Sequence, residues 1–354
     1  MSKGLGILCV VLGHAAIESL GVAESDIAHM SIAFCFSFHM PLFFLISGYF
    51  IHAERPFQWG KECRQLVLTY LCTAILVILG TGLSAVVEHE DALERMWFWF
   101  NAAVYGAGDV TGPGLTLWQV QGRIGAIWFL LAMFWARMLM HWFAKLPLTP
   151  VWVVVSFVVG WLSSRFIWLP WSIQSALCAV AYVYVGYLAR QYDVLGKLWR
   201  FPWVFIVLVA VWGIAIWKFS GFSMALNDYG ATPILAVFGA VCGTLCIVGL
   251  CRTLDRINWL AIVLSRAGQA TLAILCVHLL EDDVLPWHEI LVALYRCTPG
   301  FPLAFVAFAA HLIIDILGAW ALYYVPGVNT WFYPSLAKRR ESKHVSQIKQ
   351  TASR

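Results

Sequence analysis

Lys3-Gly-Leu-Gly-Ile-Leu-Cys-Val-Val-Leu-Gly-His14 is an apolar stretch with a basic residue at its start and a histidine deep inside it. The spacing of eleven residues corresponds to about three helical turns, so Lys3 and His14 share one helix face. At about 1.5 Å per residue, His14 lies about 16 Å beyond Lys3, near the midplane of a hydrocarbon core about 30 Å thick. Since an ionisable group is costly there, the stretch predicts a membrane-spanning helix with a functional histidine.

The composition of the whole chain is typical of a polytopic membrane protein. Its 354 residues are 61% hydrophobic and only 12% charged, whereas soluble domains carry about twice that charged fraction. We expect an all-α fold, because several apolar runs are long enough to cross a bilayer. About ten spans are predicted, at roughly 4–21, 30–51, 66–87, 126–144, 151–168, 171–189, 201–219, 232–250, 259–280 and 303–325.

The distribution of charge predicts that both termini are cytosolic. With that orientation, sixteen of the 23 Lys and Arg residues lie inside, five lie outside and two lie within or beside spans, as the positive-inside rule favours. We expect one transmembrane domain over 1–333 and a basic tail at 334–354. The tail is expected to be disordered and held near membrane lipid, and no nucleic-acid partner is predicted.

Two long outer loops are predicted. The first, about 88–125, contains Met96-Trp-Phe-Trp-Phe100 after an acidic cluster. This aromatic run favours a helix lying in the membrane interface, with a substrate-stacking platform as the alternative. The second loop, about 281–302, begins Glu281-Asp-Asp283.

His14 is the leading candidate for catalysis. The ordinary pKa of imidazole suits a general base near neutral pH. Glu18 lies four residues later on the same face, where it could orient the ring or simply snorkel at the end of the span. His39 is a second histidine at membrane depth, followed by Pro41, which can break the helix beside a cavity. Ser47-Gly48 would let a neighbouring helix approach closely.

These motifs resemble the membrane-bound acyltransferase-3 family, with the fucose 4-O-acetylase-like branch most similar. The resemblance rests on Lys3 and His14, on Phe38-His-Met-Pro-Leu-Phe-Phe44 and on Ser47-Gly48-Tyr-Phe50. Weaker matches are Trp128-Phe-Leu130 and Leu272-Ala-Ile-Leu-Cys-Val-His278. One departure is Lys3, because the family usually has Arg there, and Lys lacks the bidentate fork of a guanidinium.

The resemblance implies an O-acetyltransferase in a bacterial cytoplasmic membrane. It would move acetyl from cytosolic acetyl-CoA to a hydroxyl of an extracytoplasmic or lipid-linked glycan, a polysaccharide modification. Lys3 and His14 would be essential, with His14 as the base and a transient acetyl-histidine left open. Lys3 would hold a phosphate or the pantetheine part of CoA, or would anchor the helix at lipid headgroups.

Further residues are candidates for binding the two substrates. CoA is anionic, so basic residues at cytosolic ends could hold it, although topology alone also explains most of them: Arg55, Lys61, Arg64, Arg137, Arg252, Arg256 and Arg266. His39, Trp128 and His278 are candidates for contact with the acceptor. His311 and Asp315 form either a structural pair or a proton path. No metal is predicted, since His278 and Asp282 offer too few ligands.

The residues also leave a different function open. A proton-coupled secondary transporter of a small metabolite or lipid-linked sugar could use His14, His39 and Asp315 as a proton relay. Such transporters are typically built from repeats with paired broken helices. Here Pro41 is the one break that stands out in the sequence, which favours the acyltransferase.

Overall fold

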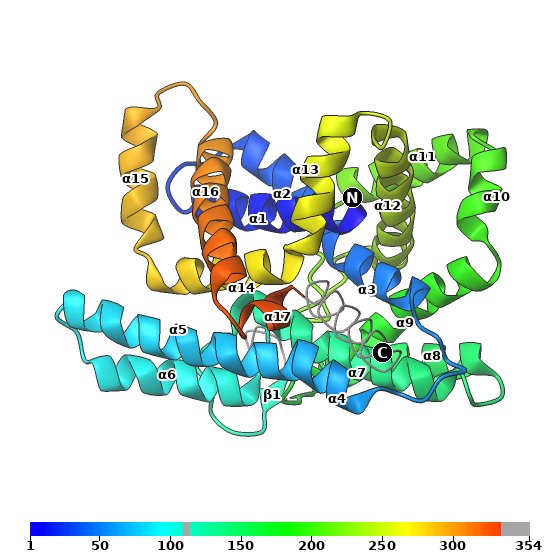
Figure 1. Cartoon of the computed structure of the whole chain (residues 1–354), viewed down its shortest axis with the longest axis horizontal. Helices are drawn as coiled ribbons and strands as arrows, with labels where there is room; N and C mark the ends of the chain where they lie inside the picture. Colours follow the sequence, from blue (N-terminus) through cyan, green and yellow to red (C-terminus); the bar gives the residue numbers. More distant parts are fainter. Residues whose placement is uncertain (109–113, 334–354) are drawn as a thin grey trace, which may run out of the picture.

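The central helix of the protein is α1 (Ser2–Leu20), which contains the stretch from Lys3 to His14. The computed structural model describes residues 1–108 and 114–333. In it, α1 packs against α2 (Asp26–Phe36), α13 (Asn258–Gln269) and α16 (Leu303–Tyr324) (Figure 1). Its buried face is rich in small residues, which permit close helix contacts. At Gly4, a Cβ atom would lie 2.0 Å from the carbonyl oxygen of Leu264, so α13 can approach α1 only because residue 4 has no side chain.

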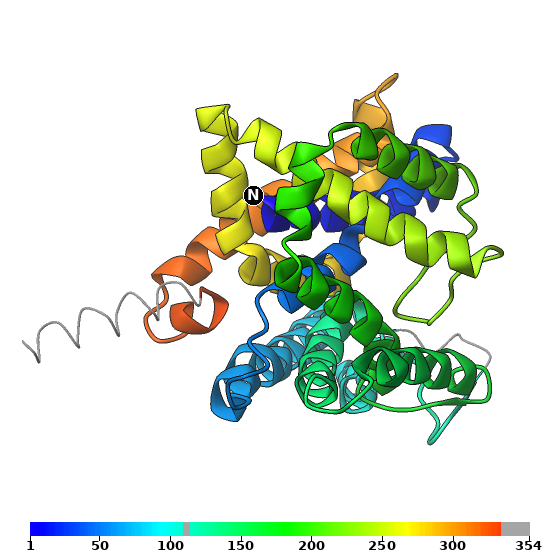
Figure 2. The same cartoon turned by 90° about the vertical axis from the view of Figure 1, so that its right-hand side faces the viewer.

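A second layer of helices lies below the bundle around α1, and three helices connect the two. Figures 1 and 2 show α5 (Leu68–Val87), α6 (Ala92–Tyr105), α7 (Trp128–Phe143) and α8 (Thr149–Ser163) below the α1 bundle. Three helices connect this layer to the bundle, namely α3 (His39–Tyr49), α9 (Ile173–Gln191) and α14 (Thr271–Val284). The other elements are α4 (Trp59–Glu62), π-helical η1 (Cys63–Val67), 3-10 helix η2 (Gly125–Ile127), α10 (Val194–Arg200), α11 (Trp203–Trp217), α12 (Pro233–Leu254), α15 (Trp287–Cys297), α17 (Asn329–Phe332), and the parallel strands β1 (Leu115–Thr116) and β2 (Ile167–Trp168).

The structure supports the expected all-α membrane fold with fewer clear spans than ten. Among residues 1–108 and 114–333, six helical segments are long and apolar enough to cross a membrane, or up to eight if each bent pair is one span. The bent pairs are α10 with α11 and α13 with α14, which turn by 110° and 66°. Hydropathy alone does not reveal such bends, because each pair taken as a whole is apolar enough to be read as one straight span. The predicted basic tail at 334–354 lies outside the described residues.

The second predicted span is interrupted where Pro41 enters it. The chain leaves helical geometry at Phe38, and α3 begins at His39. Proline cannot donate to the carbonyl four residues earlier and its ring clashes with that carbonyl, which explains the break. The predicted close approach at Gly48 is confirmed, because a Cβ atom there would lie 1.9 Å from the carbonyl oxygen of Val183 on α9. Gly186 faces Leu45 on α3 in the same way.

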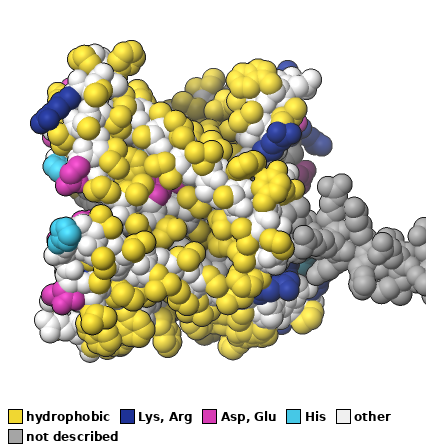
Figure 3. All heavy atoms as spheres, turned by 60° about the vertical axis from the view of Figure 1, so that its left-hand side comes forward, with side chains coloured by type: hydrophobic (Ala, Val, Ile, Leu, Met, Phe, Trp, Pro, Cys, Tyr) yellow, Lys and Arg dark blue, Asp and Glu magenta, His cyan; other side chains and the backbone are white. Residues whose placement is uncertain are grey.

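The two ends of the spans differ in charge. The turn between α5 and α6 carries Glu88, Glu90 and Asp91, and we call this side the acidic end. Arg55, Lys61 and Arg64 lie around α4 at the other end of α5, which we call the basic end. Figure 3 shows an apolar face between them, with Asp, Glu and His along its left edge and most Lys and Arg on its right.

Both long loops contain helices. In the first, α6 runs back alongside α5 from the acidic end (Figure 1). The N-cap Asp91 starts α6 by accepting hydrogen bonds from the backbone N–H groups of Leu93 and Glu94. In the second, α14 continues to Val284, and α15 packs against α16.

Candidate active site

A cavity of about 360 Å³ lies beside α1 and contains the leading sequence candidate. His14 and Glu18 line it from α1, and His39 lines it from the start of α3. Trp128 lies on the wall opposite, at the start of α7. The lining also includes Phe36, Phe129, Arg123, Asp282 and Asp283. We call this the central cavity. It brings together four of the residues that the sequence nominated for catalysis or acceptor binding.

His14 lies between two aromatic neighbours. Its ring stacks on Phe36, with centroids 6.2 Å apart, and meets the edge of His278 at 5.3 Å. Phe36 in turn contacts His39 at 4.8 Å. The Nδ1 atom of His39 donates to the carbonyl oxygen of Cys35 over 2.6 Å, which leaves its Nε2 as an acceptor. His14 is therefore held by ring packing while it keeps access to the cavity.

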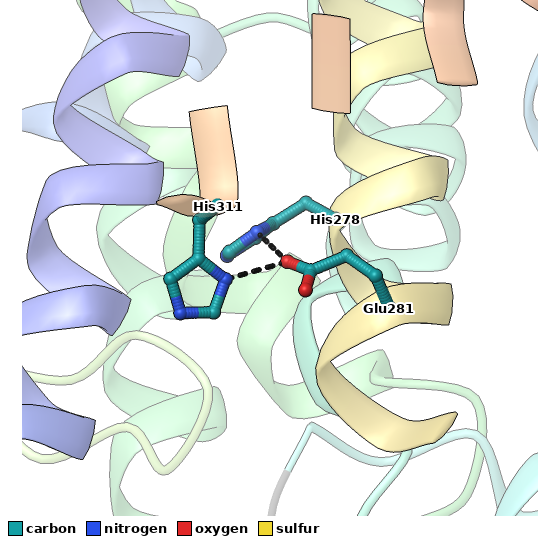
Figure 4. Close-up of side chains that lie close together, drawn as sticks. All are labelled: His278, Glu281 and His311. Atoms are coloured by element: carbon teal, nitrogen blue, oxygen red, sulfur yellow. Dashed lines mark hydrogen bonds and ion pairs between the residues drawn. The ribbon is translucent and has the colours of Figure 1, made fainter. Parts of the chain in front are cut away.

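Behind His14 is a buried network of titratable side chains on α14, α16 and α1, shown in part in Figure 4. Oε1 of Glu281 accepts hydrogen bonds from Nδ1 of His278 at 2.9 Å and from Nδ1 of His311 at 2.6 Å. Nε2 of His311 donates to Glu18 at 2.9 Å. Asp315 lies 3.4 Å from Nδ1 of His278. We call these five residues the histidine–carboxylate network.

Four of the five residues of the network are shielded from solvent, and Glu18 at the cavity is half-buried. His278, His311 and Asp315 are 0% exposed and Glu281 is 5% exposed. Both ring nitrogens of His311 face carboxylate oxygens, an arrangement that an imidazolium satisfies. Trp287 stacks on His311 at 3.6 Å, and its indole N–H donates to the backbone carbonyl of Glu281. Within the described residues, Nε2 of His278 has no hydrogen-bond partner. The network thus presents one unpaired imidazole nitrogen next to His14.

His278, Glu281 and His311 also have the residue types of a metal site, with donor atoms within 4.8 Å of one another. Their separations fit hydrogen bonds better than shared coordination. Two ligands of one tetrahedral zinc ion, each about 2.0–2.1 Å from it, would lie about 3.3 Å apart. Here the shared carboxylate oxygen lies 2.9 and 2.6 Å from the two nitrogens, which matches the distances of strong hydrogen bonds.

A second, smaller cavity of about 130 Å³ lies at the basic end. Arg55, Lys61 and Arg137 line it together with His52 and His141. Arg137 forms a bidentate pair with Glu62, with N–O distances of 2.9 and 2.7 Å, and donates to the Ser47 hydroxyl at 2.8 Å. Its guanidinium is thereby fixed in orientation. We call this the basic-end cavity.

The two cavities are joined by helices that line both. His39 and Phe43 of α3 line the central cavity, and Phe50 after its end lines the basic-end cavity. Trp128 and Arg137 do the same on α7, nine residues or about 14 Å apart along the axis. Lys3 is outside the described lining of either cavity, but it lies near enough to Arg137 for their charges to repel.

The other predicted residues fall in different places. Glu18 forms its hydrogen bond with His311, not with His14. His311 and Asp315 contact different partners, Glu281 and His278 respectively. Arg64 is exposed on η1. Arg252 stacks on Trp199 at 4.4 Å, and Arg256 and Arg266 are exposed near α13, so the structure does not gather these three with the basic-end cavity.

Some site residues carry no sequence signal that reveals their place. Arg123 lies near the end of the first loop and lines the central cavity. The segment from Phe219 to Ala225, between α11 and α12, covers the same cavity. Glu281 was visible only as part of an acidic cluster, and its contact with His311 depends on how α14 and α16 pack.

Comparisons with known proteins identify relatives of this chain. The family described as "Acyltransferase domain" matches residues 1–333. The chain is also similar to nodulation protein NolL of Mesorhizobium japonicum, with 23% identity over 255 residues. The match covers 67% of this chain and 62% of that relative, so the chain spans less than two thirds of its length. No solved structure matches the chain.

Proposed function

The chain belongs to the acyltransferase family, and from this premise we propose that it is an integral-membrane O-acyltransferase. It transfers an acetyl group from acetyl-CoA to a hydroxyl of an extracytoplasmic or lipid-linked glycan, in a bacterial cytoplasmic membrane. The observation that carries this proposal is His14, an imidazole held by aromatic rings in a cavity at the middle of the central helix. A base at that depth suits substrates that arrive from opposite sides of a membrane.

The reaction needs one proton to move twice. His14 takes the proton from the acceptor hydroxyl as its oxygen attacks the thioester carbonyl. The bond between the carbonyl carbon and sulfur then breaks, and the His14 imidazolium returns the proton to the thiolate, giving the ester and free CoA. Glu18 and Asp282 line the same cavity, where their carboxylates would stabilise that imidazolium.

His278 is the residue best placed to assist His14. Its ring contacts His14, while Glu281 and Asp315 lie at its other nitrogen. A ring fixed by carboxylates in this way holds the neighbouring imidazole in one orientation. We therefore assign His278 as a positioning residue for His14, and not as a residue that contacts the acceptor as the sequence suggested. His39 and Trp128 line the cavity and remain the proposed acceptor contacts.

The basic-end cavity is the proposed site for the anionic part of the donor. Arg55 and Lys61 supply positive charge, whereas the guanidinium of Arg137 is paired with Glu62 and fixes that carboxylate in the cavity wall. Lys3 lies at the start of α1, about three turns before His14, and we propose that it guides the donor inward. The positive-inside rule places this end in the cytosol, where acetyl-CoA is made.

Purified protein in nanodiscs tests the proposal, because a nanodisc has no compartments and therefore no transport can occur. Acetyl-CoA labelled on the acetyl group is mixed with a glycan extract from membranes of the source cells. The account predicts labelled glycan with equimolar release of CoA. Binding of sugar without either product would contradict the enzyme and favour a transporter.

A further inference from the structure

A polar groove at the acidic end meets the central cavity at Asp283. The groove has a volume of about 920 Å³ and lies along α6 and the segment 119–121. Asp283 lines both the groove and the central cavity. Its Oδ2 atom is buried and has no hydrogen-bond partner among the described residues. The groove and the cavity that contains His14 therefore adjoin at an unsatisfied carboxylate.

The helix α6 has two distinct outer faces. Leu93, Phe100 and Val104 follow one another at helical spacing and are 78%, 45% and 44% exposed, as expected for a face toward lipid. Trp97 lies on the same stripe, is 64% exposed, and also lines the edge of the groove. Glu94, Phe98 and Asn101 form a second stripe about 100° away and line the groove. The aromatic run from Met96 to Phe100 thus serves both faces: Trp97, Phe98 and Trp99 line the groove, and Phe100 does not.

The groove-lining face of α6 packs against the loop 119–122, which forms the other wall of the groove. A Cβ atom at Gly122 would lie 2.9 Å from the ring of Phe98 and 3.0 Å from Ala102, so the loop backbone lies directly against α6. Gln119 and Gln121 of this loop line the groove opposite Glu94 and Asn101. Carboxylates accept hydrogen bonds, and amides both donate and accept them.

The charges of the groove select among ligands. The lining contains the carboxylates of Glu90, Asp91, Glu94 and Asp283 and the single cation of Arg95. Arg95 is paired with Glu88 and Glu90. Hydrogen bonds from Ser84 and Arg95 lower the pKa of Glu88, so that carboxylate stays ionised beside Arg95. The described lining therefore has no free positive charge, which disfavours an anionic ligand.

We propose that this groove binds the extended part of the glycan acceptor and selects uncharged or amine-bearing sugars. A volume of about 300–1,000 Å³ is usual for a small-molecule site. The flat ring of Phe98 provides an apolar surface for a sugar face, while the amides and carboxylates pair with its hydroxyls. The inference rests on the proposed function and adds which surface recognises the acceptor and which charge it accepts.

The test compares two phenylalanines on the same helix. Phe98→Ala removes the groove ring, and Phe100→Ala is the matched control on the lipid face. Transfer of labelled acetyl to the membrane glycan extract is measured in nanodiscs against total sugar concentration. We expect Phe98→Ala to raise the apparent KM for the extract about tenfold, with kcat and the KM for acetyl-CoA unchanged, and Phe100→Ala to match wild type.

A second variant tests the groove without changing the packing of Phe98 against Gly122. The side chain of Glu94 is exposed, so Glu94→Gln leaves the fold intact. This variant is expected to raise the apparent KM for the glycan extract several-fold. If both Phe98→Ala and Glu94→Gln had the wild-type KM for the extract, the groove would not bind the acceptor, while the proposed acyltransferase activity would be unaffected. Equal effects of Phe98→Ala and Phe100→Ala would also contradict acceptor binding in the groove, and would indicate that the aromatic residues of α6 anchor this helix in lipid. Absence of transfer by the wild type would instead overturn the proposed function.

Discussion

The rings of His14 on α1 and His278 on α14 meet edge to face, with their centroids 5.3 Å apart. The two residues are 264 positions apart in the sequence, and the bend between α13 and α14 brings them together. His278 links His14 to four further titratable residues, three of them carboxylates. The proposed base is thus one end of a buried polar network, and this arrangement leads to the following predictions.

His278→Gln should lower kcat for acetyl transfer by about tenfold to a hundredfold, since it removes the ring that positions His14. The KM for acetyl-CoA should stay within about twofold, because the basic-end cavity is untouched. Steady-state kinetics in nanodiscs measure both quantities. A rise in KM at unchanged kcat would instead assign His278 to substrate binding.

Glu281→Gln should destabilise the protein strongly. Two buried imidazoles share this carboxylate, and removing one partner of a buried ionic pair costs about 3–5 kcal/mol. Thermal unfolding of the detergent-solubilised protein measures the change in Tm. Glu289→Gln is the control, because that side chain is exposed on α15 and its loss should leave Tm unchanged. Equal Tm values for both variants would exclude an ionic network.

Arg55→Gln and Lys61→Gln should each raise the KM for acetyl-CoA by about tenfold, since each removes one charge from the basic-end cavity. Raising the salt concentration should weaken donor binding in the wild type more than in either variant. Arg256→Gln provides the control, because this exposed residue is outside the described lining of that cavity. Identical donor affinity in all three variants would place the CoA site elsewhere.

Gly48→Ala should lower the Tm, because its Cβ atom would lie 1.9 Å from the backbone oxygen of Val183 and would force α3 and α9 apart. Overpacking of this kind costs about 1–3 kcal/mol or more. Gly60→Ala is the matched substitution, since nothing lies within 4 Å of a Cβ atom at Gly60. If the Tm of both variants equalled that of wild type, the close contact between α3 and α9 would be wrong.

The sequence was most informative where one helix carries the signal. The break near Pro41 and the close approach at Gly48 follow from residue type and size within single segments. The bends of α10 with α11 and of α13 with α14 could not be predicted in this way, because apolar runs look alike whether straight or bent. The count of ten spans stays a prediction, since the described residues contain six clear spans, or up to eight with the bent pairs.

The site was only partly predictable, because its contacts join distant segments. His14 and Glu18 share a face as expected, yet Glu18 pairs with His311 across the bundle. Spacing suggested that His311 and Asp315 would pair with each other, whereas tertiary packing directs them to Glu281 and His278. Basic residues illustrate the same limit: Arg137 and Arg266 both lie within or beside predicted spans, and the sequence does not reveal that Arg137 alone of the two lines the basic-end cavity.

The most direct measurement is single-turnover acetyl transfer by His14→Gln in nanodiscs, with binding of labelled acetyl-CoA measured on the same sample. Glutamine keeps hydrogen-bonding capacity but cannot take up the proton. The account predicts a rate at least about a hundredfold below wild type, with donor affinity within about twofold of wild type. Transfer at close to the wild-type rate would contradict the assignment of His14 as the base.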